Sequence, residues 1–311
     1  WLDFDNDGDL DMVTCNNTIP AGASVIPRIF RNNGDRTFTD SGIALSIISL
    51  VGAGDYDNDG DVDLALGGTY IKQTLATVMM RNDQTAWFTN GTAGLQVPGA
   101  VSMAWGDFNQ DGWLDLLLTG PSGNSNLTRL HLNNSNETFS VVATNLPGIT
   151  SGTAIGGDFD HDGRLDIFLT GAVSSRDVNS IAQLYRNGGS NVFTDSSEPL
   201  TGTRWSAAAA ADFNNDGRLD LLYCGTTNNL NNGSRTMLLQ NQIVGSNTPP
   251  ATPTNLFVSN LTSNGAVLNW SPTTDAESGG NAGLTYNLRV GTNSGGSQIM
   301  AASANPVTGW R

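Results

Sequence analysis

Polar and apolar residues alternate in four short segments within a unit of about 50 residues. In the third unit, residues 101–105 form a short run rich in small residues, and residues 114–119 form an almost continuous apolar run. Residues 127–132 and 138–142 alternate as strands do, and turn residues separate the four segments. No stretch has a convincing helical period. The pattern predicts four short strands per unit.

A nine-residue polar loop joins the first and second predicted strands of each unit. In the third unit this loop is residues 107–115, Asp-Phe-Asn-Gln-Asp-Gly-Trp-Leu-Asp. Loops 1 to 5 begin at Asp3, Asp55, Asp107, Asp158 and Asp212, so their starts are 52, 52, 51 and 54 residues apart. A fixed period of this size indicates a repeat architecture, and four strands per period are typical of propeller blades. We therefore expect an all-β fold, a β-propeller of four-stranded blades with about five blades in this sequence.

Oxygen-bearing side chains occupy positions 1, 3, 5 and 9 of every loop, and glycine occupies position 6. This is the ligand spacing of a hard-cation loop, in which short acidic side chains converge on one ion and glycine permits a sharp turn. Position 7 varies and includes tryptophan and arginine, so it would ligate through its backbone carbonyl. The predicted ligands at positions 1, 3, 5, 7 and 9 are Asp3, Asp5, Asp7, Asp9 and Asp11; Asp55, Asp57, Asp59, Asp61 and Asp63; Asp107, Asn109, Asp111, Trp113 and Asp115; Asp158, Asp160, Asp162, Arg164 and Asp166; and Asp212, Asn214, Asp216, Arg218 and Asp220.

The ion that best fits these loops is Ca²⁺, because Mg²⁺ takes fewer protein ligands and keeps more water. We expect about five structural Ca²⁺ ions. Loops 3 and 5 should bind more weakly, since Asn109 and Asn214 replace an aspartate at position 3. Position 2 is always aromatic and position 8 always aliphatic, which predicts that both anchor the loop to a core.

The charge of the chain is concentrated in these loops. The net charge of the 311 residues is −15, and the loops carry 20 of the 29 acidic residues. Five divalent ions would reduce the net charge to about −5. This balance argues against a nucleic-acid partner, which requires a basic face. No run of 18 apolar residues is present, so membrane insertion is not expected.

Catalytic residues are not expected in this sequence. His131 lies on an alternating segment and is predicted to be exposed, and His161 at loop position 4 is predicted to point outward. No serine or cysteine nucleophile motif accompanies them. Cys15 and Cys224 follow loops 1 and 5 at equivalent points and are read as partly buried thiols, because equivalent points of separate repeats rarely approach disulfide distance.

Exposed tryptophans offer a second kind of site. Trp87, Trp113 and Trp205 are candidates for stacking on sugar rings, with packing between strands as the alternative. The choice between the two depends on how far each ring is exposed.

The character of the sequence changes after residue 243. Residues 244–254 form a Pro-rich linker, and residues 256–258, 266–270 and 284–290 alternate as antiparallel strands. Residues 255–311 are too few for a complete β-sandwich, so we expect a truncated one. Because residue 1 already lies inside a repeat, we also expect a longer parent chain.

The Asp-x-Asp/Asn-x-Asp-Gly-x-x-Asp loop, following a strand of small residues, resembles the FG-GAP/VCBS repeats of integrin alpha chains and many bacterial extracellular proteins. The resemblance covers residues 1–243 and implies a propeller, often of seven blades, with calcium in a hairpin loop of each blade. Residues 250–311 resemble the first part of a fibronectin type III domain in Pro250, Pro253, Trp270 and Tyr286. The later strands of such a domain are missing from residues 250–311.

The leading functional hypothesis is a non-catalytic, calcium-stabilised module, secreted or on the cell surface, for adhesion to a protein or glycan ligand. The alternative is an accessory region of a larger secreted enzyme. A third interpretation is a purely structural spacer.

Overall fold

The structure is a computed structural model, and it describes residues 1–14, 28–45, 50–69, 75–83, 88–91, 95, 100–122, 125–174, 179–227, 233–243, 251–262 and 265–274. The chain forms two compact units, Trp1–Thr248 and Pro249–Arg311. The described residues form strands, turns and loops, with no helix among them.

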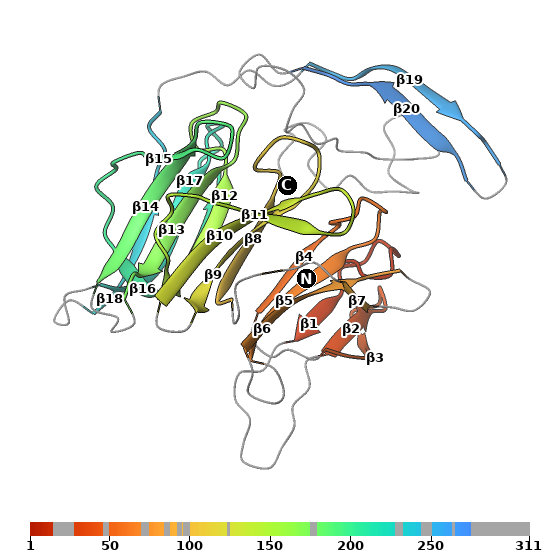
Figure 1. Ribbon diagram of the computed structural model, residues 1–311. Coiled ribbons are helices and arrows are strands. Elements are labelled where there is room, and N and C mark those ends of the chain that lie inside the picture. The colour runs from red at the N-terminus through yellow and green to blue at the C-terminus, as the bar shows by residue number, and fades with distance from the viewer. Residues whose placement is uncertain are drawn as a thin grey trace, which may run out of the picture. The chain divides into compact units, whose positions relative to one another are not determined.

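The first unit contains five antiparallel sheets, each made of strands that are consecutive in the chain (Figure 1). Their strands are β1 (Met12–Thr14), β2 (Arg28–Asn32) and β3 (Phe38–Ala44); β4 (Leu50–Gly54), β5 (Asp63–Thr69), β6 (Leu75–Arg81) and β7 (Thr89–Gly91); β8 (Ser102–Gly106), β9 (Asp115–Ser122), β10 (Ser125–Asn133) and β11 (Phe139–Val142); β12 (Thr150–Gly157), β13 (Asp166–Ala172), β14 (Ser180–Asn187) and β15 (Phe193–Asp195); and β16 (Thr203–Ala211), β17 (Asp220–Thr227) and β18 (Ser234–Leu239). Sheets two to four have the four predicted strands per repeat.

The first and fifth sheets are the incomplete ones within the described residues. The first sheet starts with the strand that follows loop 1, and ahead of it only Leu2 forms a bridge, to Asp11. The fifth sheet has the first three strands of a repeat. Its first strand contains Ala207–Ala211, so the extended conformation expected there is confirmed against the high helix propensity of alanine.

Small residues in the first strands allow neighbouring sheets to pack closely. The first strands β4, β8, β12 and β16 lie side by side in chain order. A Cβ added at Gly106, the last residue of β8, would lie 2.5 Å from Cδ1 of Leu165 in loop 4. The same relation holds for Gly54 with Leu114 and for Gly157 with Leu219. A larger side chain at these positions would separate adjacent sheets.

The core lies between sheets, which decides where the predicted loop anchors are buried. The position 2 aromatics of loops 1 to 4 are at most 5% exposed, and they share clusters with residues of the following sheet. Phe213 of loop 5 is 49% exposed, and Leu10 at position 8 of loop 1 is 58% exposed. The anchoring prediction is therefore wrong at these two ends. Position 2 packs on the next sheet, and position 8 packs on the preceding sheet. Among the described residues, loop 5 has no next sheet and loop 1 has no preceding sheet.

A phenylalanine at the start of the fourth strand packs against the preceding sheet in the third and fourth repeats. Phe139 of the third sheet shares a buried cluster with Tyr56 and Met79 of the second. Phe193 of the fourth sheet is fully buried and shares a cluster with Phe108 and Leu130 of the third. The third and fourth sheets thus each insert an aromatic side chain against the preceding sheet.

The second unit has one described element, the antiparallel pair β19 (Thr254–Ser259) and β20 (Val267–Ser271). These strands agree with the alternation at residues 256–258 and 266–270. The third predicted strand, residues 284–290 with Tyr286, and most of the predicted linker lie outside the described residues. The fibronectin type III resemblance is not shown by this pair of strands, and the truncated sandwich stays a prediction.

Candidate cation-binding loops

The backbone of each loop is folded around the aspartate at position 1. Its two carboxylate oxygens accept the backbone N–H groups of positions 5 and 6 at 2.8 to 3.2 Å in all five loops. Position 4 has a positive φ in every loop, and so has the glycine that follows two residues later. At Gly112 φ is +89°, a value that L side chains rarely adopt, which explains the constant glycine at position 6.

The aspartate at position 9 is fixed in the interior by two backbone donors. One of its oxygens accepts the N–H of position 2, and the other accepts the N–H of an asparagine on the third strand, at 2.7 to 3.2 Å. These carboxyls are at most 2% exposed. Burial raises the pKa of Asp63, Asp115 and Asp166 to about 7 from an ordinary value of 3.8.

Three loops bring aspartate oxygens into one tight group. In loops 1, 2 and 4, one oxygen from each of positions 1, 3 and 9 lies within 4.8 Å of the others. At position 3, Oδ1 of Asp5, Asp57 and Asp160 is buried without a hydrogen-bond donor. Burial, followed by the charge of the nearest aspartate, raises the pKa of all three carboxyls. These carboxylate oxygens could coordinate a divalent cation, so the residues fit the ion expected from the sequence.

Loops 3 and 5 use their asparagine differently. Nδ2 of Asn109 donates to Asp111 at 2.8 Å, and Nδ2 of Asn214 donates to Asp216 at 2.9 Å. The amide oxygen of each accepts the backbone N–H of position 5. The amides therefore satisfy part of the acidic loop through internal hydrogen bonds. The lower cation affinity expected for loops 3 and 5 stays a prediction.

Position 5 lies outside the three groups and is held in other ways. Its Oδ1 accepts the backbone N–H of position 7 in every loop. Arg31 forms ion pairs with Asp5 at 2.7 Å and Asp7 at 2.8 Å, and it lowers the pKa of Asp7. Arg164 and Arg218, at position 7, pair with the position 5 aspartates of loops 4 and 5. Ligation by position 5 and by the position 7 carbonyl therefore stays a prediction.

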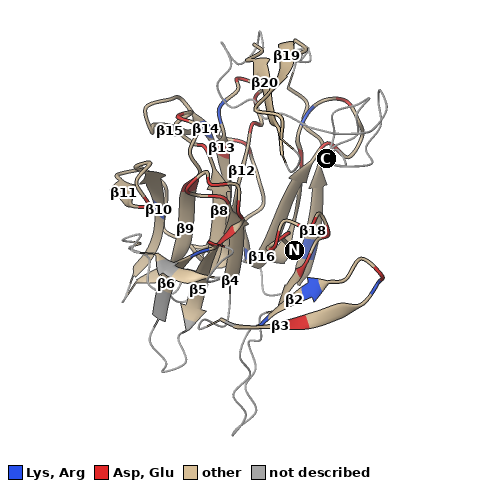
Figure 2. Cartoon of the chain, turned by 90° about the vertical axis from the view of Figure 1, so that its right-hand side faces the viewer, with Lys and Arg blue, Asp and Glu red and all other residues tan. Residues whose placement is uncertain are grey.

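Figure 2 places these acidic residues in the molecule: its red stretches fall mainly in the turns between strands. The acidic loops therefore lie at the ends of the strands, and in loops 2 to 5 the aspartate at position 9 is the first residue of the second strand. The three aspartate groups described above belong to these turns.

One residue in the framework of the loops was missed by the sequence analysis. An asparagine on the third strand donates through Nδ2 to the position 2 carbonyl of the preceding loop. For Asn133 the acceptor is Tyr56 O at 2.7 Å, and for Asn187 it is Phe108 O at 2.9 Å. Asn82 and Asn241 make the same bond to loops 1 and 4. The signal was available, because an asparagine recurs six residues before a phenylalanine in four units.

The side chain at position 4 of loops 1 to 3 forms hydrogen bonds to the following loop. Asn6 donates to Gly60 O at 3.3 Å and to Asp61 Oδ1 at 2.7 Å. Asn58 and Gln110 donate to the position 6 carbonyls of loops 3 and 4. His161, expected to point outward, is only partly exposed and its Nε2 is buried, so that expectation is wrong. Consecutive loops from loop 1 to loop 4 are thus joined in both directions.

The histidine, tryptophan and cysteine candidates differ in how far they are buried. His131 is fully buried and its pKa is lowered by burial to about 4, so the expected exposure is wrong. Trp113 is half-buried, whereas Trp205 is 63% exposed with the Arg204 guanidinium 4.6 Å from its ring centre. Cys224 is unpaired and partly buried, as expected. Cys15 and Trp87 lie outside the described residues.

Comparison with protein families explains the repeated geometry. The model described as "FG-GAP-like repeat" matches residues 3–66, 55–118, 107–169 and 158–223. The chain belongs to the FG-GAP-like repeat family. Each match begins at position 1 of one loop and extends past the next loop, so these FG-GAP-like repeats include all five. The comparison with curated proteins finds no match. Among the described residues, no helix has the length and apolarity that a membrane span requires.

Proposed function

We propose that this chain is a calcium-stabilised, non-catalytic binding module that acts outside the cell or at its surface. The observation that carries the proposal is the convergence of positions 1, 3 and 9 in loops 1, 2 and 4, with a buried carboxylate oxygen at position 3 that has no protein donor. Family membership supports the extracellular setting, because FG-GAP-like repeats typify extracellular proteins.

The ion's role would be structural. Carboxylates about 4 to 5 Å apart repel one another by about 1 kcal/mol per pair in water and by several at an effective dielectric constant near 20. A divalent cation converts that repulsion into attraction. At a calcium concentration about tenfold above the dissociation constant, each site adds roughly 1.4 kcal/mol of stability. Five sites would add about 7 kcal/mol, comparable to the stability of a whole domain.

A β-propeller is the architecture that we propose for residues 1–243. Four-stranded sheets in simple chain order, first strands side by side and loops tied to both neighbours all support it. Residues 244–254 would act as a linker, and residues 255–311 would form a partial fibronectin type III-like domain.

The metal proposal is tested by thermal unfolding after exhaustive EDTA dialysis, followed by back-titration with CaCl₂ or MgCl₂. We expect melting at a lower temperature in EDTA, with full recovery in millimolar Ca²⁺ and weaker recovery in Mg²⁺. Calorimetry gives the number of ions, for which we expect about five. An unchanged melting curve in EDTA, with no heat of calcium binding, would refute the proposal.

The partner that we propose is a protein or a carbohydrate, and Trp205, at 63% exposed, is more available than Trp113 to stack on a sugar. The buried state of His131 supports the absence of a catalytic base at that position. A glycan array probed with the intact parent protein, with and without EDTA, tests the binding role. Calcium-dependent binding supports an adhesion module. Hydrolysis by the parent with no binding by these repeats would favour the alternative, an accessory region of a secreted enzyme.

A further inference from the structure

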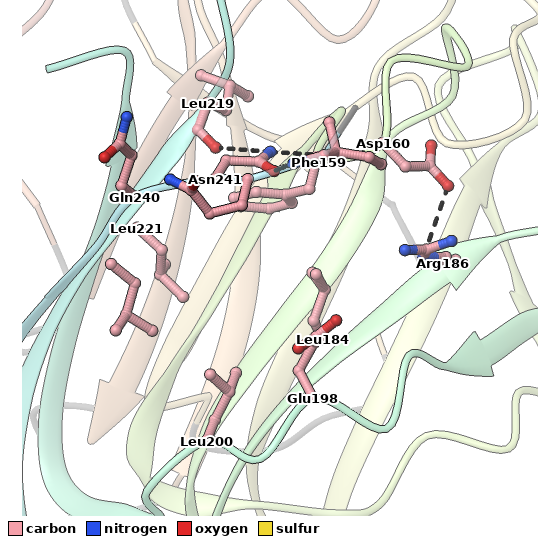
Figure 3. A pocket seen from close by; sticks show the side chains of 13 residues that line it. Phe159, Asp160, Leu184, Arg186, Glu198, Leu200, Leu219, Leu221, Gln240 and Asn241 are labelled. Atoms are coloured by element: carbon pink, nitrogen blue, oxygen red, sulfur yellow. Dashed lines mark hydrogen bonds and ion pairs between the residues drawn. The ribbon is translucent and has the colours of Figure 1, made fainter. Parts of the chain in front are cut away.

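A cavity of about 360 Å³ lies between the fourth and fifth sheets. Figure 3 shows Leu221 of β17 on one wall and Leu184 of β14 with Leu200 on the other. Phe159 of loop 4, Leu219 of loop 5, Leu239 of β18 and Ile243 complete the apolar lining. The rim is polar, with the Asp160–Arg186 ion pair on one side. The cavity therefore has an apolar interior and an edge that can form hydrogen bonds.

The preceding interface shows what fills the equivalent space. Between the third and fourth sheets, five of the seven apolar lining residues have an apolar counterpart in a buried cluster, at the same position of the repeat. The counterparts of Phe159, Leu184, Leu200, Leu221 and Leu239 are Phe108, Leu130, Leu146, Ile167 and Tyr185. All five counterparts belong to the buried cluster that surrounds Phe193. The cavity is thus the position of Phe193 without its aromatic ring.

The sequence explains why the ring is missing in the fifth repeat. In four repeats a phenylalanine stands six residues after the third-strand asparagine: Phe38, Phe88, Phe139 and Phe193. Six residues after Asn241 stands Asn247, and residues 242–250 contain no aromatic residue. The fifth repeat therefore lacks the side chain that closes the other interfaces.

The neighbouring strand edge also lacks its usual partner. In the fourth sheet, Phe193 pairs with Asn187 and Asp195 pairs with Tyr185, so the fourth strand runs antiparallel to β14. In the fifth sheet β18 pairs with β17, and no fourth strand is present among the described residues. An added strand would find backbone donors and acceptors beside the cavity.

We propose that the cavity and the β18 edge bind an extended segment of another protein that carries an aromatic residue. The segment would pair antiparallel to β18, with its aromatic side chain opposite Asn241 and inserted among the five apolar wall residues. Continuity with the interface that holds Phe193 determines this occupant: the same walls, in the preceding pair of sheets, already enclose a strand of the type Phe-Thr-Asp. The proposal goes beyond calcium binding and does not depend on it.

The test uses the complete 311-residue chain in calcium and a fluorescein-labelled peptide with the sequence of residues 190–197, Ser-Asn-Val-Phe-Thr-Asp-Ser-Ser. Anisotropy should show saturable binding. A peptide with alanine in place of phenylalanine should bind about 10- to 100-fold more weakly, because burial of the ring is lost. This comparison leaves the folded protein unchanged.

Two neighbouring residues of β18 provide matched protein variants. Leu239 lines the cavity and is partly buried, whereas Leu238 is 56% exposed. Leu239→Glu should weaken peptide binding at least about tenfold, since it places a charge in an apolar wall. Leu238→Glu should bind the peptide as tightly as the unmutated chain does. Amide exchange in β18 should slow when the peptide binds.

Three results would overturn the proposal. The first is no saturable binding at millimolar peptide. The second is equal binding of the phenylalanine and alanine peptides. The third is a dimer of the chain alone that Phe38→Ala abolishes, because a second copy would then be the occupant.

Discussion

Replacing Asn133 tests whether the sheets are held together by the third-strand asparagine. Its side chain is 5% exposed and makes three hydrogen bonds: to Tyr56 O at 2.7 Å, to Leu114 O at 3.2 Å, and from Ser135 N at 2.9 Å. Alanine removes all three and leaves their partners unpaired. At about 0.5 to 1.5 kcal/mol for each bond, the loss is about 1.5 to 4.5 kcal/mol. That is a large part of a typical unfolding free energy of about 5 to 15 kcal/mol.

Two other asparagines serve as controls for this substitution. Asn134 is exposed and bonds only within its own turn, so Asn134→Ala should change stability by no more than about 0.5 kcal/mol. Asn32 has the same place in the first repeat, but the bonds of its side chain are to Leu10 O and Gly34 N, both in its own repeat. Asn32→Ala should therefore cost about 1 kcal/mol.

Urea unfolding in saturating calcium measures all three variants, with similar slopes expected so that the midpoints can be compared. A cost for Asn133→Ala no greater than that for Asn134→Ala would refute the role of Asn133 in joining the sheets. Equal costs for Asn133→Ala and Asn32→Ala would show that the bond to the preceding loop contributes nothing. Asn133→Asp should be at least as costly as alanine, since a carboxylate cannot donate to the two carbonyls.

Three further predictions concern the loops. Asp57→Asn should convert one of the tighter calcium sites seen by calorimetry into a weaker one, and Asn109→Asp should strengthen a weak site. Equal affinities in all loops of the unmutated protein would contradict both. In EDTA, Asp63, Asp115 and Asp166 bind protons below about pH 7 in the folded state, but only near pH 4 in the unfolded state. The unfolding free energy should therefore rise as the pH falls from about 7 to about 4. The slope is at most about 1.4 kcal/mol per pH unit for each carboxyl, and urea titrations that show no rise would count against their burial. Gly112→Ala should lower the unfolding free energy by about 1 to 2 kcal/mol, because φ at Gly112 is +89° and the space around it is free. Gly188→Ala, at an ordinary φ, should lower it less. Similar urea midpoints for the two variants would contradict the backbone argument.

Local patterns in the sequence determined the strands and the loops. Strand positions follow from alternation and turn residues, and the conformation of a loop follows from an aspartate that accepts neighbouring N–H groups and a glycine with positive φ. These interactions span at most nine residues, so a repeated nine-residue motif contains them. Even the extended state of Ala207–Ala211 could be predicted, because the equivalent strands of other repeats contain glycine.

Only the tertiary structure decided which of these positions face a neighbouring sheet. Phe213 and Phe108 occupy the same position of their loops, yet the first is half exposed and the second is buried. His131 alternates like a surface residue and is nevertheless buried, because both faces of β10 are covered. The bond from Asn133 to Tyr56 O spans 77 residues. Burial in a repeat protein depends on contacts between repeats, and a pattern within one repeat cannot indicate whether a neighbour covers it.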